Sequence, residues 1–179
     1  MKSSDRPSVI VVGVDYSDVS YGVLRNAFQT ACGSPQTEVH LIHVQSALQA
    51  YPCCGSDPRP SAEEMLGRAQ ERLQAFARKE LASFQDTQRR AEVRSLTLVA
   101  HVRRTAPAEE IAQLAGELRA DLIVVGTHGW AGEVRVGSVE HAVVTLAPCP
   151  VLVVREKALP PRTASSRPPS MACLETTSD

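Results

Sequence analysis

The segment LIVVGTHGWAGEVRVGS, residues 122–138, joins a short apolar run to a glycine-rich loop that ends in a serine. The run Leu122–Val125 is continuously apolar, which is typical of a parallel strand buried on both faces. Residues 126–138 include four glycines, and glycine lets backbone N–H groups approach a ligand closely. Ser138 can cap a helix that follows. The segment therefore predicts a strand, then a loop shaped to surround a ligand, and then a helix.

Strand and helix signals alternate along the rest of the chain. Further apolar runs predict strands at Val9–Val14, Glu38–Val44, Val93–Val102 and Val151–Val154. Helical spacing and capping residues, including the capping-box pattern SAEE at 61–64, predict helices that begin near Ser17 or Asp18, Ser61, Pro107 and Ser138. Strands joined by helices run parallel with right-handed crossovers. The order predicts a single-domain α/β fold, a doubly wound five-stranded parallel sheet with helices on both faces.

Length and composition set the class of protein. The 179 residues include 43% hydrophobic and 22% charged residues, which suits one globular domain. The net charge of −1 does not favour nucleic acid or acidic membranes as partners. No apolar run approaches the roughly 20 residues that cross a bilayer, and the N-terminus is too weakly apolar for a secretory signal. Five cysteines without a disulfide framework fit a reducing compartment, so we expect a soluble, cytoplasmic protein.

The two ends of the chain and one loop differ from the rest in composition. Residues 1–7 are expected to form a flexible N-terminus and residues 8–156 the domain. Residues 157–179 are rich in Pro, Ser and Thr and lack a sustained apolar periodicity, so they predict a disordered tail. The loop 46–60 contains the vicinal pair Cys53 and Cys54, which we interpret as two loop thiols because no metal-binding partners accompany them.

A ligand site is expected where the winding of the sheet reverses. Open parallel sheets bind ligands beyond the carboxyl ends of their strands, at that switch point. Asp15 follows the first strand and the glycine-rich loop follows the fourth. If these strands are neighbours, Asp15 can accept a ribose hydroxyl while the helix that begins at Ser138 attracts a phosphate. The loop has neither the P-loop pattern nor the GxGxxG fingerprint, so an anion or nucleotide site and a tight structural loop stay open as alternatives.

Three stretches of the chain resemble the universal stress protein family: VIVVGVDYSDVS at 9–20, LIHV at 41–44, and the long block from Ala120 to Arg155. The resemblance covers about Ser8 to Arg155. It implies a five-stranded parallel sheet in the order 3-2-1-4-5, similar to the adenine nucleotide alpha-hydrolase-like fold. Many members bind ATP through the motif G-x2-G-x9-G-[ST], so the resemblance suggests ATP as the ligand.

Carried over residue by residue, the resemblance implies a set of nucleotide-binding positions. The motif glycines and serine correspond to Gly126, Gly129, Gly137 and Ser138. Asp15 would lie near the ribose, Val14 and Val44 would offer backbone contacts to adenine, and His128 and Val139 would flank the phosphate path. The chain departs from the motif because seven residues separate Gly129 from Gly137 where the family has nine. The shorter arc either runs more tightly around the phosphates or has lost ATP while the fold is kept.

Three functional hypotheses follow. The first is a stress-response protein that binds an adenine nucleotide, the second is a dimeric interaction protein that does not bind ATP, and the third is an adenine-nucleotide hydrolase. No Ser-His-Asp or Cys-His arrangement can be assigned from the sequence, and no histidine pair has zinc-ligand spacing. We therefore expect no dedicated catalytic residues and no metal site.

The last predicted strand indicates the oligomeric state. Residues 149–155 carry no charge before Arg155, and a strand at the edge of a sheet leaves backbone N–H and C=O groups unpaired beside its apolar face. Pairing with a second copy across a twofold axis satisfies both, and the family resemblance points the same way. The sequence predicts a homodimer through Val151, Leu152, Val153 and Val154.

Overall fold

A computed structural model describes residues 6–45, 61–87, 96–127 and 138–155 of the chain. The elements in chain order are β1 (Ser8–Gly13), α1 (Asp18–Ala31), β2 (Thr37–Val44), α2 (Ala62–Thr87), β3 (Leu96–Arg103), α3 (Pro107–Glu117), β4 (Leu122–Thr127), α4 (Ser138–Leu146) and β5 (Val151–Arg155). The five strands form one sheet in the order β3-β2-β1-β4-β5, and all of their pairings are parallel. This confirms the predicted fold class and strand order.

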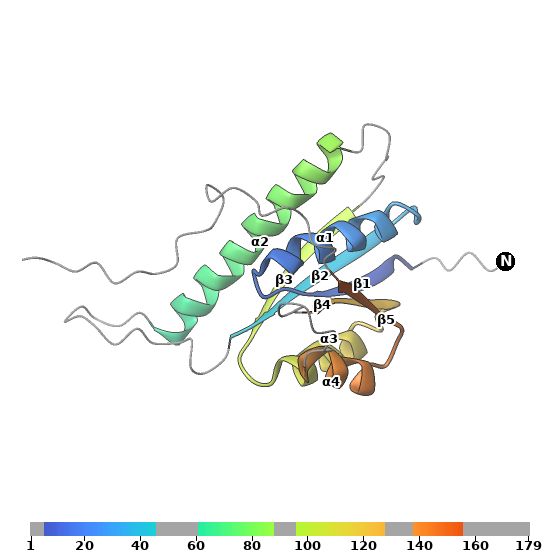
Figure 1. The fold of residues 1–179 in the computed structure, drawn as a ribbon. Coiled ribbons are helices and arrows are strands. Elements are labelled where there is room, and N and C mark those ends of the chain that lie inside the picture. The colour runs from blue at the N-terminus through green and yellow to red at the C-terminus, as the bar shows by residue number, and fades with distance from the viewer. Residues whose placement is uncertain (1–5, 46–60, 88–95, 128–137, 156–179) are drawn as a thin grey trace, which may run out of the picture.

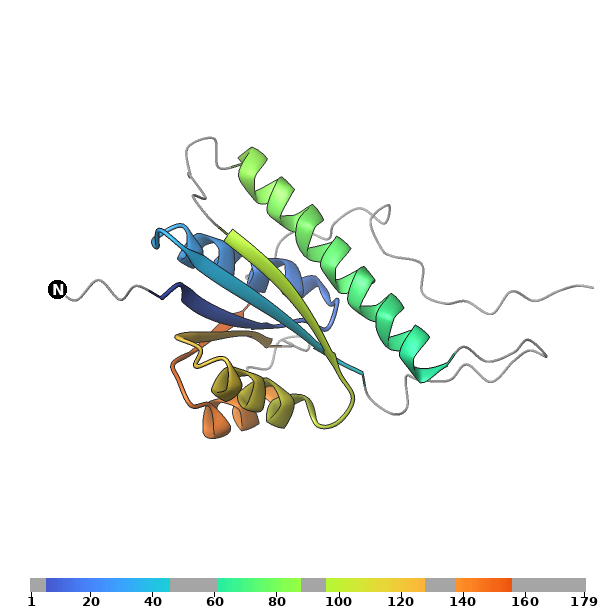
Figure 2. The ribbon, with the colours of Figure 1, turned by 180° about the vertical axis from the view of Figure 1, so that it is seen from behind.

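Helices cover both faces of the sheet (Figures 1 and 2). Helices α1 and α2 pack on one face and helices α3 and α4 on the other, each pair over its own apolar cluster. Successive residues of a strand point to opposite faces, so Ile10 and Val12 belong to the first cluster while Val9 and Val11 belong to the second. Strand β1 is therefore continuously apolar from Val9 to Val12, where both of its faces are buried.

Strand β1 lies at the centre of the sheet, between β2 and β4. Its register places Ile10 beside Leu122 and Val12 beside Val124. From β1 the chain first winds outward through β2 to β3, and then returns to the other side through β4 to β5. The switch point thus lies at the carboxyl ends of β1 and β4, where the sequence places Asp15 and the glycine-rich loop.

The helix starts follow the predicted signals with two differences. The capping box at α2 is formed, since the Ser61 N–H donates to Glu64 Oε2 at 2.8 Å and the Glu64 N–H donates to Ser61 Oγ at 3.1 Å. Ser17 occupies the N-cap position of α1, but its side chain makes no capping hydrogen bond. Helix α4 begins at Ser138 itself, so the serine is its first helical residue rather than the residue before it.

Several predictions fall outside the described residues. They concern the pair Cys53 and Cys54, the expected site residues His128, Gly129 and Gly137, most of the N-terminal segment 1–7, and the tail 157–179.

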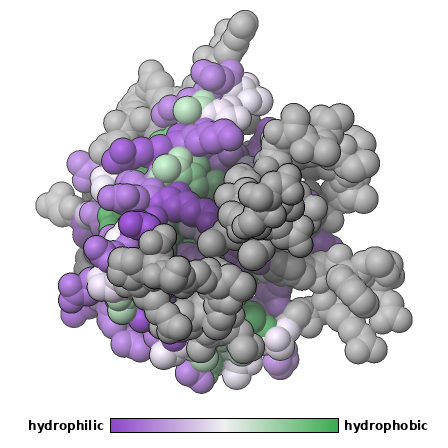
Figure 3. Space-filling model, turned by 90° about the vertical axis from the view of Figure 1, so that its left-hand side faces the viewer, coloured by the Kyte–Doolittle hydropathy of each residue, from purple (hydrophilic) through white to green (hydrophobic). Residues whose placement is uncertain are grey.

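Within the described ranges, no helix combines the length and the apolar character needed to cross a bilayer. Seen from the side toward which the strands end, apolar surface is visible between hydrophilic side chains (Figure 3).

Candidate functional site

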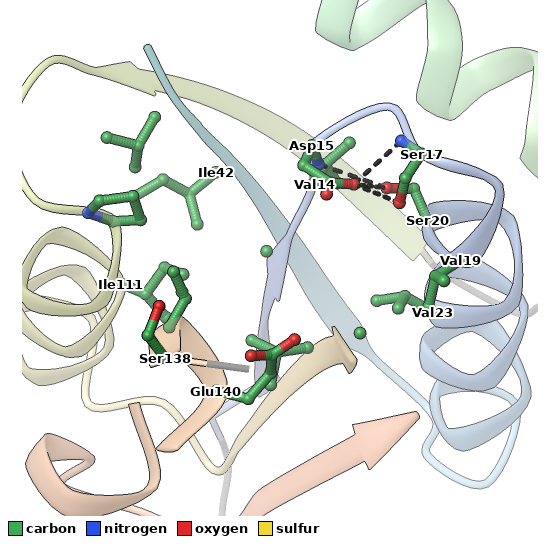
Figure 4. Close-up of a pocket in the computed structure, with 16 residues that line it drawn as sticks. Val14, Asp15, Ser17, Val19, Ser20, Val23, Ile42, Ile111, Ser138 and Glu140 are labelled. Atoms are coloured by element: carbon green, nitrogen blue, oxygen red, sulfur yellow. Dashed lines mark hydrogen bonds between the residues drawn. The ribbon is translucent and has the colours of Figure 1, made fainter. Parts of the chain in front are cut away.

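A cavity of about 350 Å³ opens at the switch point, between the carboxyl ends of β1 and β4. One part of its wall is apolar and comes from β2, α3 and β4. Figure 4 shows Ile42 and Ile111 on this side, and Val44, Pro107 and Val125 line the cavity with them. An apolar slot between branched side chains suits a flat, largely apolar ring such as a nucleobase.

Asp15 lies on the opposite side of the cavity, two residues beyond the end of β1 (Figure 4). Its Oδ1 atom accepts hydrogen bonds from the Ser17 N–H at 2.9 Å, the Ser17 hydroxyl at 2.6 Å and the Ser20 hydroxyl at 2.7 Å. Ser20 is 2% exposed, while Asp15 is exposed toward the cavity mouth. Asp15 therefore organises the turn into α1, and these bonds orient a carboxylate that also lines the cavity.

Tyr16 makes the turn that brings these groups together. Its φ angle of 63° is left-handed, a conformation that is strained for a bulky residue. The ring is fixed by His43 and Phe76, whose ring centroids lie 4.7 and 5.4 Å away, and by the Arg72 guanidinium at 4.8 Å. Burial raises the pKa of the Tyr16 hydroxyl. Aromatic packing thus holds the backbone bend that aims Asp15 at the cavity.

The backbone of Val14 is engaged inside the protein. Its N–H donates to the Ile42 carbonyl at 2.9 Å, and its carbonyl accepts a hydrogen bond from His43 Nδ1 at 2.8 Å. Burial lowers the pKa of His43, while the bond to the Val14 carbonyl opposes that shift. Because a carbonyl oxygen has two lone pairs, the expected contact between Val14 and adenine would have to use the second one.

Gly126, at the end of β4, has a structural reason to be glycine. A Cβ atom at this position would lie 2.5 Å from Val19 Cγ1 and 3.0 Å from Val23 Cγ2, both on α1. Real Cβ atoms do not approach other atoms so closely, so only glycine lets α1 pack directly on β4. The same residue lines the cavity. The close packing explains the glycine whether or not a ligand binds.

The first turn of α4 completes the wall. Ser138 and Val139 line the cavity and are exposed, Val139 by 37%. Glu140 also lines it but is only 4% exposed, and Figure 4 shows its carboxylate on the α4 side of the space. The positive end of a helix dipole would favour an anion near this turn.

The described part of the chain brings together six of the residues that the sequence indicated, because all of these line one cavity: Val14, Asp15, Val44, Gly126, Ser138 and Val139. Sequence reasoning missed Ser20, Ile111 and Glu140. Of these three, only Glu140 could have been noticed in the sequence, because it is an acidic residue two positions after Ser138, where a phosphate-binding helix is predicted to begin. In the described ranges, no group of three or more His, Cys, Asp and Glu side chains could hold a metal ion.

Comparison with known proteins gives one consistent set of matches. The model of the universal stress protein family matches residues 8–155. The chain is 32% identical over 149 residues to universal stress protein MJ0531 of Methanocaldococcus jannaschii, covering 82% of this chain and 81% of that one. It is 31% identical over 150 residues to universal stress protein YxiE of Bacillus subtilis, and the match covers 82% of this chain and 97% of that one.

A solved structure resembles the whole described fold. It is the universal stress protein from Archaeoglobus fulgidus in complex with dAMP, which has 25% sequence identity and a TM-score of 0.54. The match covers 82% of this chain and 96% of that protein.

Proposed function

Because this chain belongs to the universal stress protein family, we propose that it binds an adenine nucleotide in the cavity at the switch point. The observation that carries the proposal is the convergence of Val14, Asp15, Val44, Gly126, Ser138 and Val139 on one cavity. The dAMP complex of the Archaeoglobus fulgidus relative supports the same ligand class. The proposed function is binding, with no catalytic residue assigned.

The walls of the cavity suggest how the ligand lies. The adenine ring would enter the apolar slot between Ile42, Val44 and Ile111. The ribose would face Asp15, whose carboxylate is held in place by Ser17 and Ser20 and can accept a hydrogen bond from a ribose hydroxyl. A phosphate would extend toward Gly126 and Ser138. The family resemblance suggests ATP as this ligand.

Calorimetry on the full chain tests this proposal with two matched variants. Asp15→Asn removes the charge that faces the ribose, and Asp18→Asn removes an exposed charge three residues later that does not line the cavity. AMP should bind to the wild type and to Asp18→Asn with similar affinity, and more weakly to Asp15→Asn. The absence of binding by the wild type at millimolar AMP, or an equal loss in both variants, contradicts the proposal.

We also propose that the chain forms a homodimer through β5. All four large hydrophobic residues that are exposed in the described part of the chain lie on α4 and β5: Val139, Val144, Leu146 and Leu152, at 37, 52, 50 and 37%. Strand β5 is the last strand of the sheet on that side. Apolar side chains beside an unpaired strand edge favour a second copy as the partner. This exposed apolar surface is also compatible with the second hypothesis, a dimeric interaction protein.

A further inference from the structure

Tyr16 connects the ligand cavity to a helix that lies outside the cavity wall. The residues on either side of it in the chain, Asp15 and Ser17, both line the cavity (Figure 4). The Tyr16 ring instead packs against the apolar cluster between the sheet and helices α1 and α2. None of the described residues that line the cavity belongs to α2, so an effect of this helix on a ligand has to pass through another residue.

Two side chains of α2 hold the Tyr16 ring. Phe76 packs edge-on against it, with the ring centroids 5.4 Å apart and the ring planes at 69°, and the Arg72 guanidinium lies over it at 4.8 Å. Phe76 makes a second edge contact, to Tyr21 of α1, also at 5.4 Å. Edge-to-face ring pairs and cations over an aromatic ring are attractive beyond the area that they bury. The Tyr16 ring is therefore fixed from the α2 side.

The backbone of Tyr16 depends on these contacts. Its φ angle of 63° lies in the left-handed region, which bulky residues rarely adopt. Such a conformation persists only where the surrounding structure stabilises it over its alternatives. If φ changed to a negative value, the peptide groups next to Asp15 and Ser17 would turn, and the wall of the cavity would change with them.

Helix α2 is fixed to the sheet by contacts that do not involve Tyr16. The side-chain amides of Gln70 and Gln74 donate to the Ala100 and Leu98 carbonyls of β3 at 3.0 and 3.1 Å, and Leu73 between them is buried. Because these anchors hold the helix, loss of the Phe76 ring should release Tyr16 without detaching α2.

We propose that Phe76 and Arg72 are positioning residues of the ligand site: they hold Tyr16 in its left-handed conformation and thereby set the affinity for the nucleotide from outside the cavity. The inference rests on the proposed function, because it takes the cavity to be the adenine site. It assigns a role in ligand binding to one face of α2.

Calorimetry with AMP on the full chain compares Phe76→Leu with the matched control Phe84→Leu. Phe84 is the more deeply buried of the two, but it lies eight residues, or about 12 Å, further along α2 and packs on Phe28. Phe76→Leu should weaken AMP binding about threefold to tenfold, as expected for the loss of an aromatic pair. Phe84→Leu should lower thermal stability at least as much and leave AMP binding unchanged. Wild-type affinity in Phe76→Leu, or an equal loss of affinity in both variants, overturns the proposal.

A double-mutant cycle with Tyr16→Gly shows whether Phe76 acts through the backbone of residue 16. Glycine adopts a positive φ without strain but also samples many other conformations, so Tyr16→Gly alone should weaken AMP binding. With no ring left to hold, the further change Phe76→Leu should cost no more affinity in this background. An equal loss from Phe76→Leu in both backgrounds would show a general structural role and contradict the proposal.

Two milder changes keep the test independent of folding. Tyr16→Phe, the conservative variant, should rescue the affinity that Tyr16→Gly loses, because it keeps the ring and removes a hydroxyl that has no hydrogen-bond partner in the described part of the chain. Arg72→Gln should weaken AMP binding about twofold to fivefold, whereas Arg78→Gln, which changes another exposed arginine of α2, should not. Failure of the rescue, or equal effects of the two arginine variants, contradicts the proposal.

The outcomes separate this inference from the proposed function. If the wild type does not bind AMP, the adenine site itself is wrong. If the wild type binds AMP and Phe76→Leu binds it equally well, only the role of α2 is wrong.

Discussion

The Ser20 hydroxyl donates a hydrogen bond of 2.7 Å to Asp15 Oδ1 and accepts one of 3.3 Å from the Asp15 N–H. This reciprocal pair ties the end of β1 to the first turn of α1. Ser20 is 2% exposed, so water does not readily replace its hydroxyl. The direction in which Asp15 points is therefore set by a buried residue of α1 that also lines the cavity.

Replacing Ser20 with Ala should weaken adenine-nucleotide binding by about threefold to tenfold, because one internal hydrogen bond contributes on the order of 1 kcal/mol. Thr30→Ala is the control, since the Thr30 hydroxyl donates to the Asn26 carbonyl on the exposed side of the same helix, away from Asp15. Calorimetry with AMP compares the two. Equal affinity of Ser20→Ala and wild type would mean that Asp15 is oriented by other contacts.

Gly126→Ala should lower the free energy of unfolding by about 1–3 kcal/mol, the usual cost of overpacking a well-filled interior. The added methyl group would meet Val19 Cγ1 at 2.5 Å. Gly67→Ala is the control, because nothing lies within 4 Å of its Cβ position in the second turn of α2. Urea denaturation measures both.

Combining Gly126→Ala with Val19→Ala should cost less than the sum of the two single changes, because the second change makes room for the first. Strict additivity in this double-mutant cycle would show that the glycine is needed for another reason, such as the ligand.

Acidification should destabilise the pairing of β2 and β3. His40 Nδ1 and His101 Nε2 lie 2.9 Å apart, and burial, with the positive charges of His40 and Arg103, lowers the pKa of His101 to about 4. Unfolded histidine titrates near 6.5, so between these values the unfolded chain binds more protons and stability is lost as the pH falls. The loss should be about 1–2 kcal/mol, because the partly buried ring is screened by solvent.

Urea denaturation at a series of pH values measures this loss. His101→Gln should flatten the dependence between about pH 4 and 6.5, whereas His141→Gln, which replaces an exposed histidine on α4, should leave it unchanged. If the slope persists in His101→Gln, the titrating group lies elsewhere.

Leu152→Asp should separate the proposed homodimer. Leu152 is 37% exposed on β5, whereas Val153 packs against the cluster beneath α3 and α4, so a charge at 152 disturbs the surface with less damage to the core. Sedimentation should show a dimer for the wild type and for Ala82→Asp, an exposed site on α2, and a monomer for Leu152→Asp. A monomeric wild type at tens of micromolar would contradict the dimer.

The fold could be predicted because its determinants are local. Continuous β-branched runs such as Val9–Val14 are typical of doubly buried strands, and the spacing between them fits helices. Boundaries shifted by one residue: β1 spans Ser8–Gly13 rather than Val9–Val14, and β2 begins at Thr37 rather than at Glu38. Such shifts occur because tertiary contacts decide how far an element extends.

The site could be predicted only where position in the topology determined it. Asp15 lies just beyond β1 and Gly126 lies near the end of β4, and both strands are central, so their place at the switch point could be inferred. Ser20 could not, because its contact depends on the left-handed turn at Tyr16, a conformation that the sequence does not signal for an aromatic residue. Nor does the sequence show that Val19 would contact a Cβ atom at 126.

The most direct test of the adenine site is methyl-resolved NMR of the full chain titrated with AMP. The account predicts that the methyl signals of Ile42, Val44 and Ile111 shift in a saturable way, because the base would lie against them. The methyl signals of Leu73, a buried residue of α2 on the other face of the sheet, should not move. The proposal that AMP binds in the cavity would be contradicted if no methyl signal shifted at millimolar AMP. It would also be contradicted if saturable shifts occurred only at residues that do not line the cavity.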